Sequence, residues 1–218
     1  FSFLILSVFL IKNKKDFFKI VFSFFILVFF LNVFEKTNTA DYHSPYQNVS
    51  VQYFNNNHTP MQIKSNNIWL QIPLNLSEEF YIKKNKNWYD LYSLPYKIKN
   101  FKSKQTLIVG SGVGNDVAAS LRDSSAKIDA VEIDPLVADL GIKFHPEKPY
   151  LNDRVNLTIN DARNFIKETK KKYDLIIYSV LDSHANLSGK GGVRLDSYVY
   201  TVESFFEAKQ KLNRNGII

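Results

Sequence analysis

The stretch Thr106-Leu-Ile-Val109-Gly110-Ser-Gly112-Val-Gly114-Asn-Asp116 decides the fold class. Its first four residues are β-branched or aliphatic, which is typical of a short buried strand, and three glycines at alternate positions follow them. Glycines at these positions allow a tight turn and let a ligand approach the backbone where a helix begins. The dinucleotide-binding fingerprint would have a glycine at position 115, where this chain has Asn115.

Strands and helices alternate from this stretch to the end of the chain. The pattern predicts strands at 106–109, 127–133, 155–159 and 173–180, helices at 116–122, from 135, at 161–166 and at 202–212, and a fifth strand from 215. Repeated βα units predict an α/β fold with a Rossmann-like, methyltransferase-type parallel sheet and a ligand crevice at the carboxyl ends of its strands. A sheet of this type has further strands, so we expect it to be truncated at its C-terminus.

Acidic residues follow three of the predicted strands. Glu132 lies 22 positions after Gly110, where a carboxylate can accept both hydroxyls of a ribose or can be a solvated strand end. Asp134 is interpreted as a helix cap, because Pro135 opens a helix after it. Asp161 can accept the amino group of an adenine or cap the next helix, and Asp182 follows the fourth strand, where it can react or form a loop turn.

The part before residue 101 has a different composition. Eleven of the 18 Phe lie in the first 34 residues, and 17–34 is an apolar run of about bilayer length. The chain begins without an initiator Met, so we expect a fragment that starts within a membrane region. The predicted organisation is a transmembrane region of two helix fragments (1–34), a linker (35–48), a small β unit (49–100) and an incomplete nucleotide-binding domain (101–218).

Charge and composition exclude several classes of function. The net charge is +7, of which residues 1–34 contribute +3, and the remaining +4 is spread without a long basic block or arginine cluster. We therefore predict no nucleic-acid partner. The chain has no Cys and its four His are scattered without metal-ligand spacing, so no metal site is predicted.

Taken together, these motifs resemble the spermidine synthase (polyamine aminopropyltransferase) family. The upstream Ser44-Pro-Tyr46 looks like the opening of that family, and the resemblance covers about residue 42 to the end. The segment 193–201 is similar to the membrane-attached branch of these proteins. The motifs that carry the resemblance are the glycine loop 109–116, Val131-Glu-Ile-Asp134, the stretch 152–163, and Tyr173-Asp-Leu-Ile-Ile177 before Asp182.

The resemblance implies a class I methyltransferase-type fold that binds S-adenosylmethionine or its decarboxylated form as co-substrate. Gln71 would contact the methionine-derived part of the nucleotide, and Glu132 would hold the ribose. The other implied contacts are the backbone of Gly110, Gly112 and Gly114, and Asp161 with the adjacent Ala162 at the adenine.

The catalytic positions depart from the family pattern. Soluble members carry an aspartate after the fourth strand that deprotonates the attacking amine, and Ser179 stands at that position. Asp182 keeps the second acid of the motif, and Asp90 lies where the family has Tyr-His-Glu. Asp182 and Asp90 are therefore the candidate catalytic residues, because a serine hydroxyl cannot by itself accept the proton of an amine.

The predicted function is aminopropyl transfer to a polyamine by a spermidine synthase-like transferase. Ser179 keeps two alternatives open, a methyltransferase that uses S-adenosylmethionine and a non-catalytic nucleotide-binding module. The predicted partners are a small-molecule amine or methyl acceptor and membrane lipid through residues 1–34, and a homodimer is a further alternative. The predicted location is a membrane, with the catalytic domain on the cytoplasmic side.

Overall fold

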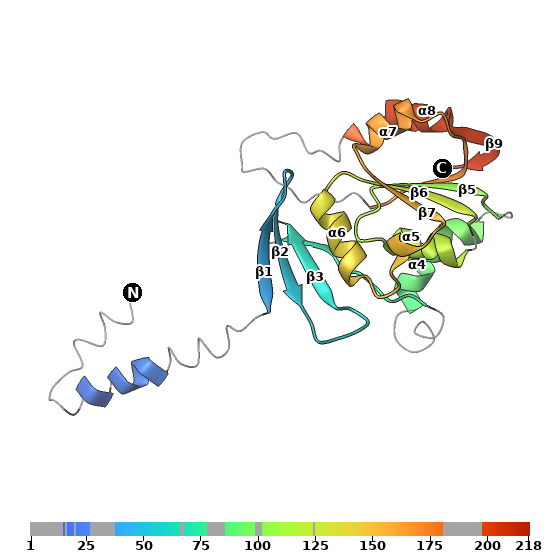
Figure 1. Cartoon of the computed structure of the whole chain (residues 1–218). Coiled ribbons are helices and arrows are strands. Elements are labelled where there is room, and N and C mark those ends of the chain that lie inside the picture. The colour runs from blue at the N-terminus through green and yellow to red at the C-terminus, as the bar shows by residue number, and fades with distance from the viewer. Residues whose placement is uncertain are drawn as a thin grey trace. The chain divides into compact units, whose positions relative to one another are not determined.

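The computed structural model describes residues 15, 17–19, 21–26, 38–65, 68–77, 86–98, 102–123, 125–180 and 198–218. The chain forms two compact units, Phe1–Asn38 and Thr39–Ile218, and the second contains both sheets of the structure (Figure 1).

A five-stranded parallel sheet is the centre of the second unit. Its strand order is β7-β6-β5-β8-β9, and every neighbouring pair is parallel, which confirms the predicted α/β class. The order reverses on either side of β5, so the carboxyl ends of β5, β6 and β8 meet where such sheets bind their ligands. The strands are β5 (Gln105–Val109), β6 (Lys127–Glu132), β7 (Val155–Ile159), β8 (Tyr173–Tyr178) and β9 (Leu212–Ile217).

Helices cover both faces of this sheet because its strands are apolar on both sides. Ile108 of β5 packs in one core with residues of α4 (Lys86–Ile98), α5 (Asn115–Arg122) and the 3₁₀ turn η1 (Pro149–Leu151). Its neighbours Leu107 and Val109 point to the other face and pack with α7 (Ala162–Glu168) and α8 (Val202–Lys209). Successive side chains of β5 point to opposite faces of the sheet, so they pack against helices on both sides.

A four-stranded antiparallel sheet precedes the parallel sheet. Its strands follow chain order, and their buried residues Val49, Val51, Met61 and Ile63 form one core with α6 (Pro135–Phe144). Gln71, the last residue of the fourth strand, accepts a hydrogen bond from the Val113 amide, so this strand ends beside the loop after β5. The strands are β1 (Thr39–His43), β2 (Asn48–Tyr53), β3 (Met61–Ser65) and β4 (Ile68–Gln71).

Several elements differ from the sequence prediction. β1 forms within the segment expected to be a linker, because its backbone pairs with β2 from Thr39 to His43. The stretch Trp88–Tyr96 predicts a short helix that Pro95 stops, but α4 continues through Pro95 to Ile98, since Tyr96 remains buried against the sheet and holds the last turn. α8 ends at Lys209, three residues early, because Leu212 pairs with β8 and begins β9.

The predicted membrane location is corrected. In the first unit, the residues described as helical are 15, 17–19 and 21–26. Within the described residues, no helix has both the length and the apolar character that crossing a bilayer requires. The prediction of a membrane location is therefore wrong. Lipid contact through residues 1–34 is not shown, and most of these residues lie outside the described part of the chain.

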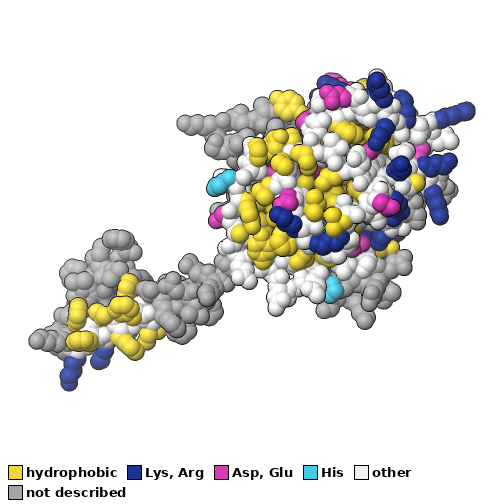
Figure 2. Space-filling view, viewed as in Figure 1, with side chains coloured by type: hydrophobic (Ala, Val, Ile, Leu, Met, Phe, Trp, Pro, Cys, Tyr) yellow, Lys and Arg dark blue, Asp and Glu magenta, His cyan; other side chains and the backbone are white. Residues whose placement is uncertain are grey.

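Charged side chains of both signs lie on the second unit, and on the face in Figure 2 they border a broad area of hydrophobic side chains. On the face in Figure 2, acidic side chains lie between the lysine and arginine side chains. Several form exposed ion pairs one helical turn apart, such as Lys143 with Asp139 at 2.6 Å. Pairs of this kind contribute little to stability because water screens them.

Candidate active site

The glycine loop after β5 has a backbone that only glycine adopts without strain. Gly110, Gly112 and Gly114 have φ angles of 71°, 56° and 105°, all in the left-handed region. The amide groups of Gly110 and Ser111 both donate to the carbonyl of Val131 on β6, at 2.9 Å each. The loop thus turns sharply from β5 into α5 while staying tied to the neighbouring strand.

Two side chains of η1, those of Pro149 and Tyr150, pack against the glycine loop. A Cβ added to Gly114 would lie 2.8 Å from the Pro149 ring and 3.3 Å from the Tyr150 ring. The Tyr150 hydroxyl is buried, donates to the Gly112 carbonyl at 2.6 Å and forms a second hydrogen bond with the Ser111 hydroxyl at 2.8 Å. The turn η1 therefore holds the glycine loop in position.

Gln71, at the end of β4, reaches the same loop from the small sheet. Its side-chain oxygen accepts from the Val113 amide at 2.9 Å, and a Cβ on Gly112 would lie 2.4 Å from its amide group. The structure thus brings Gln71 and the three glycines together, as their predicted shared role requires. Their contact with a nucleotide stays a prediction.

Glu132 ends β6 and faces the glycine loop. Its carboxylate is buried and accepts from the Gly112 amide at 2.7 Å and from the Asp134 amide at 3.0 Å. Burial raises the pKa of Glu132, and the backbone hydrogen bonds oppose that shift. A carboxylate has about four acceptor sites, so Glu132 can accept a further hydrogen bond from a ligand.

The other two acids after β6 and β7 cap helices. Asp134 accepts from the Leu136 amide at 3.0 Å and so caps α6, as predicted, and it also accepts from the Gln47 side chain. Asp161 is exposed at the tip of β7 and accepts from the Asn164 amide at 2.8 Å, with Ala162 buried behind it. The cap is therefore present in the structure, and the adenine contact of Asp161 and Ala162 stays a prediction.

The candidate catalytic acids lie apart from this cluster or outside the described residues. Asp90 is on an outer face of α4, where it forms ion pairs with Lys86 at 2.5 Å and Lys97 at 2.6 Å. Hydrogen bonds from these two lysines lower the pKa of Asp90. Asp182 falls outside the residues that the structure describes.

Ser179 follows β8 beside the glycine loop. Its amide donates to the Val109 carbonyl at 3.1 Å, and its own carbonyl accepts from the Tyr200 hydroxyl at 2.5 Å. Its side chain is buried, and among the described residues the hydroxyl has no hydrogen bond of normal geometry. It nevertheless lies close enough to Asp116 to lower the pKa of that carboxyl, which burial raises to about 6.

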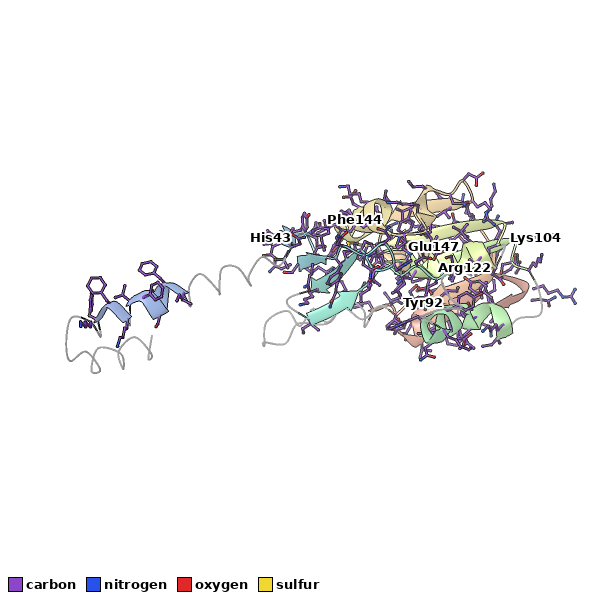
Figure 3. All side chains as sticks on the ribbon, turned by 90° about the horizontal axis from the view of Figure 1, so that it is seen from below. His43, Tyr92, Lys104, Arg122, Phe144 and Glu147 are labelled. Carbon is purple, nitrogen blue, oxygen red and sulfur yellow. The ribbon has the colours of Figure 1, made fainter. Side chains whose placement is uncertain are left out.

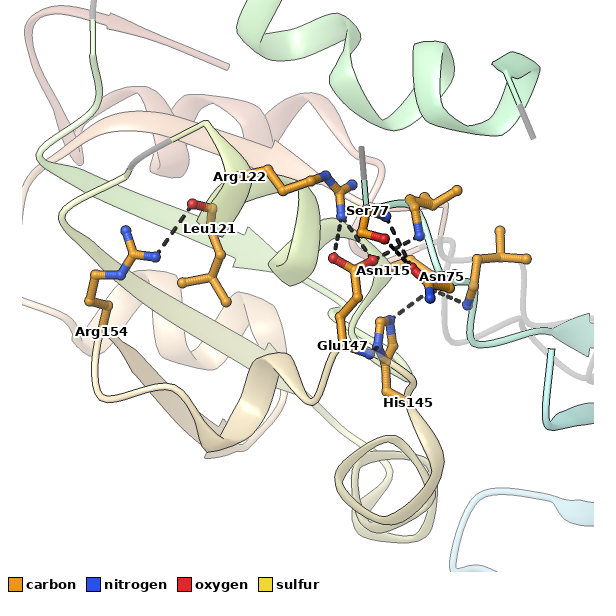
Figure 4. Close-up of polar contacts among 10 residues, drawn as sticks. Asn75, Ser77, Asn115, Leu121, Arg122, His145, Glu147 and Arg154 are labelled. Atoms are coloured by element: carbon orange, nitrogen blue, oxygen red, sulfur yellow. Dashed lines mark hydrogen bonds and ion pairs between the residues drawn. The ribbon is translucent and has the colours of Figure 1, made fainter. Parts of the chain in front are cut away.

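Asn115, where the fingerprint has glycine, connects three parts of the unit (Figure 4). Its side-chain oxygen accepts from the Leu74 amide at 3.0 Å and pairs with His145 Nε2 at 3.1 Å. Its nitrogen donates to the Ile72 carbonyl at 2.9 Å and to the Tyr92 hydroxyl at 3.1 Å. Sequence reasoning did not assign Asn115 a role, although its departure from the glycine pattern was a signal.

A partly buried ion pair extends this network. Arg122 of α5 binds both carboxylate oxygens of Glu147, at 2.7 and 2.9 Å, and Glu147 also accepts from the Leu76 amide at 2.8 Å (Figure 3). The Glu147 amide donates to His145 Nδ1 at 3.1 Å, so the ring carries its proton on Nε2. Burial lowers the pKa of His145 to about 3, which keeps the ring neutral.

Comparison with known proteins identifies the family. A model of the spermine/spermidine synthase domain matches residues 90–218, more than half of the chain. The polyamine aminopropyltransferase of Buchnera aphidicola subsp. Acyrthosiphon pisum is 35% identical over 118 residues, which cover 52% of this chain and 38% of the relative. Polyamine aminopropyltransferase 2 of Aquifex aeolicus is 28% identical over 119 residues, covering 52% of this chain and 22% of that relative.

Solved structures agree on the fold. Spermidine synthase from Thermotoga maritima has a TM-score of 0.61 at 17% identity, covering 83% of this chain and 56% of that chain. A spermidine synthase in complex with the transition state analogue AdoDATO has a TM-score of 0.62 at 17% identity, covering 82% and 56%. This chain therefore spans only part of the proteins it matches. Because the domain model covers most of the second unit, the chain belongs to the spermine/spermidine synthase family.

Proposed function

We propose that this chain binds decarboxylated S-adenosylmethionine and transfers its aminopropyl group to an amine of a polyamine. Family membership supports the reaction class, and the buried Glu132 carboxylate at the glycine loop carries the proposal. An acceptor at this position suits a ribose with two free hydroxyls, and the glycine backbone leaves room for the ligand to approach. A ligand that carries sulfur and a charged chain would extend from the ribose past Gln71.

The proposed nucleotide contacts use groups that the structure holds in place. Glu132 would accept hydrogen bonds from the ribose, Gln71 would contact the sulfonium-bearing part, and Asp161 with Ala162 would contact the adenine. Gln71 can approach the glycine loop closely because Gly112 has no side chain, since a Cβ there would lie 2.4 Å from the Gln71 amide group. Asp182 and Asp90 stay candidate catalytic residues, and a homodimer stays a prediction.

Methyl transfer from S-adenosylmethionine is the second candidate, and Ser179 favours it. Aminopropyl transfer requires a neutral amine, while polyamine nitrogens are cations near neutral pH and must first lose a proton. Ser179 offers no carboxylate for that step. Methyl transfer to an acceptor without a charged nitrogen depends more on alignment of the reacting atoms.

Calorimetry with both nucleotides, followed by a product assay with putrescine, tests the proposal. We expect the decarboxylated nucleotide to bind and putrescine to be converted into a longer polyamine. A methylated product would support the second candidate, and tight binding with no turnover of any amine would support a non-catalytic nucleotide-binding module. Failure to bind either nucleotide would refute all three functions.

Glu132→Gln tests the ribose contact directly. The variant keeps the volume and one acceptor but removes the charge, so two charge-assisted hydrogen bonds to the ribose are weakened, and we expect about a 100-fold loss of nucleotide affinity. Glu168→Gln is the matched control, because Glu168 is exposed at the far end of α7 and should bind as the unmodified chain does. Unchanged affinity in Glu132→Gln would refute the ribose contact.

A further inference from the structure

The end of β4 carries Gln71, and the small sheet fixes its position only in part. β4 pairs with β3 as far as Gln71, and the register of this pairing shifts between Lys64 and Ile63, just before the last pair. A shift of this kind bends a strand and increases its twist. β4 ends at Gln71, so pairing with β3 does not hold the backbone that follows.

The side chain of Asn115 holds this backbone (Figure 4). Its nitrogen donates to the Ile72 carbonyl at 2.9 Å, and its oxygen accepts from the Leu74 amide at 3.0 Å. One carboxamide thus binds an acceptor and a donor two residues apart, as a residue of a parallel neighbouring strand would. Pro73 lies between them and has a fixed φ angle, so the segment 72–74 has little freedom to move.

Asn115 is itself held in one orientation. The side chain is buried at the start of α5, and its oxygen also pairs with His145 Nε2 at 3.1 Å. Its nitrogen also donates to the Tyr92 hydroxyl at 3.1 Å. A flipped carboxamide would place its NH₂ group against two donors, the Leu74 amide and His145 Nε2–H. The hydrogen bonds therefore define which end of the carboxamide faces the segment after β4.

Gln71 is thus fixed through both its side chain and the backbone that follows it. The Val113 amide donates to its side-chain oxygen at 2.9 Å, and Asn115, two positions after Val113, binds the backbone of the next residues. The side chain of Gln71 is partly exposed and so is accessible to a ligand. It lies 2.4 Å from where a Cβ on Gly112 would be, so a small shift of the strand end would change its contact with the loop.

We infer that Asn115 is the positioning residue for Gln71. It holds the backbone after β4 so that the Gln71 amide lies where the sulfur-bearing chain of the nucleotide leaves the ribose. The inference rests on the proposed function, in which Gln71 contacts that part of decarboxylated S-adenosylmethionine. Asn115 therefore contributes, through Gln71, to the selection of nucleotides that carry this chain over nucleosides that lack it.

Calorimetry with decarboxylated S-adenosylmethionine and with adenosine tests this role in the whole chain. Adenosine has the same base and ribose but no sulfur-bearing chain, so the ratio of the two dissociation constants reports on the Gln71 contact. Asn115→Asp keeps an oxygen for the Leu74 amide and His145 and removes the donor to Ile72. We expect it to weaken binding of the decarboxylated nucleotide about 10-fold and to change adenosine binding by less than about 2-fold.

Gln71→Ala completes a double-mutant cycle. It should weaken binding of the decarboxylated nucleotide about 10-fold, and adding Asn115→Asp should cause no further loss, because both changes act on one contact. Tyr92→Phe is the matched control, since it removes a partner of the same Asn115 nitrogen and leaves the bonds to Ile72 and Leu74. It should change neither dissociation constant. If circular dichroism shows that Asn115→Asp is unfolded, Asn115→Ser takes its place with the same expected ratio.

The outcomes separate the inference from the function. Equal weakening of both ligands in Asn115→Asp would overturn the positioning role, and conversion of putrescine would still support aminopropyl transfer. Additive losses in the double variant would also overturn it, because Asn115 would then act by a route other than Gln71. Failure of the unmodified chain to bind the decarboxylated nucleotide would refute the proposed function and the inference together.

Discussion

Replacing Asn115 with Ala should destabilise the unit more than any single exposed change. The side chain makes four hydrogen bonds, and its loss leaves the Leu74 amide and His145 Nε2–H without acceptors in a buried place. Each stranded donor costs about 1–3 kcal/mol, and the bonds to Ile72 and Tyr92 add about 0.5–1.5 kcal/mol each. We expect the free energy of unfolding to fall by at least about 3 kcal/mol.

Urea unfolding followed by circular dichroism measures this change as a lower midpoint at an unchanged slope. Asn164→Ala is the matched control, since Asn164 is exposed in α7, and its effect should stay within about 0.5 kcal/mol. A loss below about 1 kcal/mol in Asn115→Ala would mean that water replaces the lost bonds and that Asn115 does not hold the segment after β4 to α5.

Two further predictions concern the same region. His145 has a folded pKa of about 3, below its unfolded value near 6.5, so stability present above pH 6.5 should be lost as the pH falls, by about 1.4 kcal/mol per pH unit. The free energy of unfolding measured at pH 7 and pH 5 checks this loss. The same pH dependence of that free energy in His145→Gln would contradict it. Gly112→Ala should weaken nucleotide binding at least about 10-fold in calorimetry, because its Cβ would meet Gln71 at a φ of +56°. Adding Gln71→Ala should recover part of the loss, and no recovery would contradict the clash.

The parallel sheet could be predicted from sequence because its signals are local. The buried run before Gly110 predicts a strand, and the glycines predict the turn after it. The acid that ends β6 marks the next strand, and all three signals lie within about 30 residues. Asp134 as a helix cap was equally visible, since a cap depends on the next few residues. Where strand pairing decided the outcome, as for β1 with β2 and for the end of α8, where Leu212 pairs with β8, the local patterns were insufficient.

The parts of the site that sequence reasoning missed depend on contacts between distant segments. Asn115 binds Leu74, 41 positions earlier, and His145, 30 positions later, so no spacing rule indicates it. The apolar run at 17–34 has the composition of a membrane span, and composition alone led to the wrong location.

The glycine loop, supported by Tyr150 and tied to Glu132, has a consequence for the kinetics of binding. Hydrogen bonds within the protein hold its conformation, so the entropy of ordering it is lost when the chain folds. Association should then show a single phase whose rate rises linearly with nucleotide concentration, as for a preformed site. None of the free energy of the nucleotide contacts is used to order the loop. We therefore expect all of it to slow dissociation of the nucleotide.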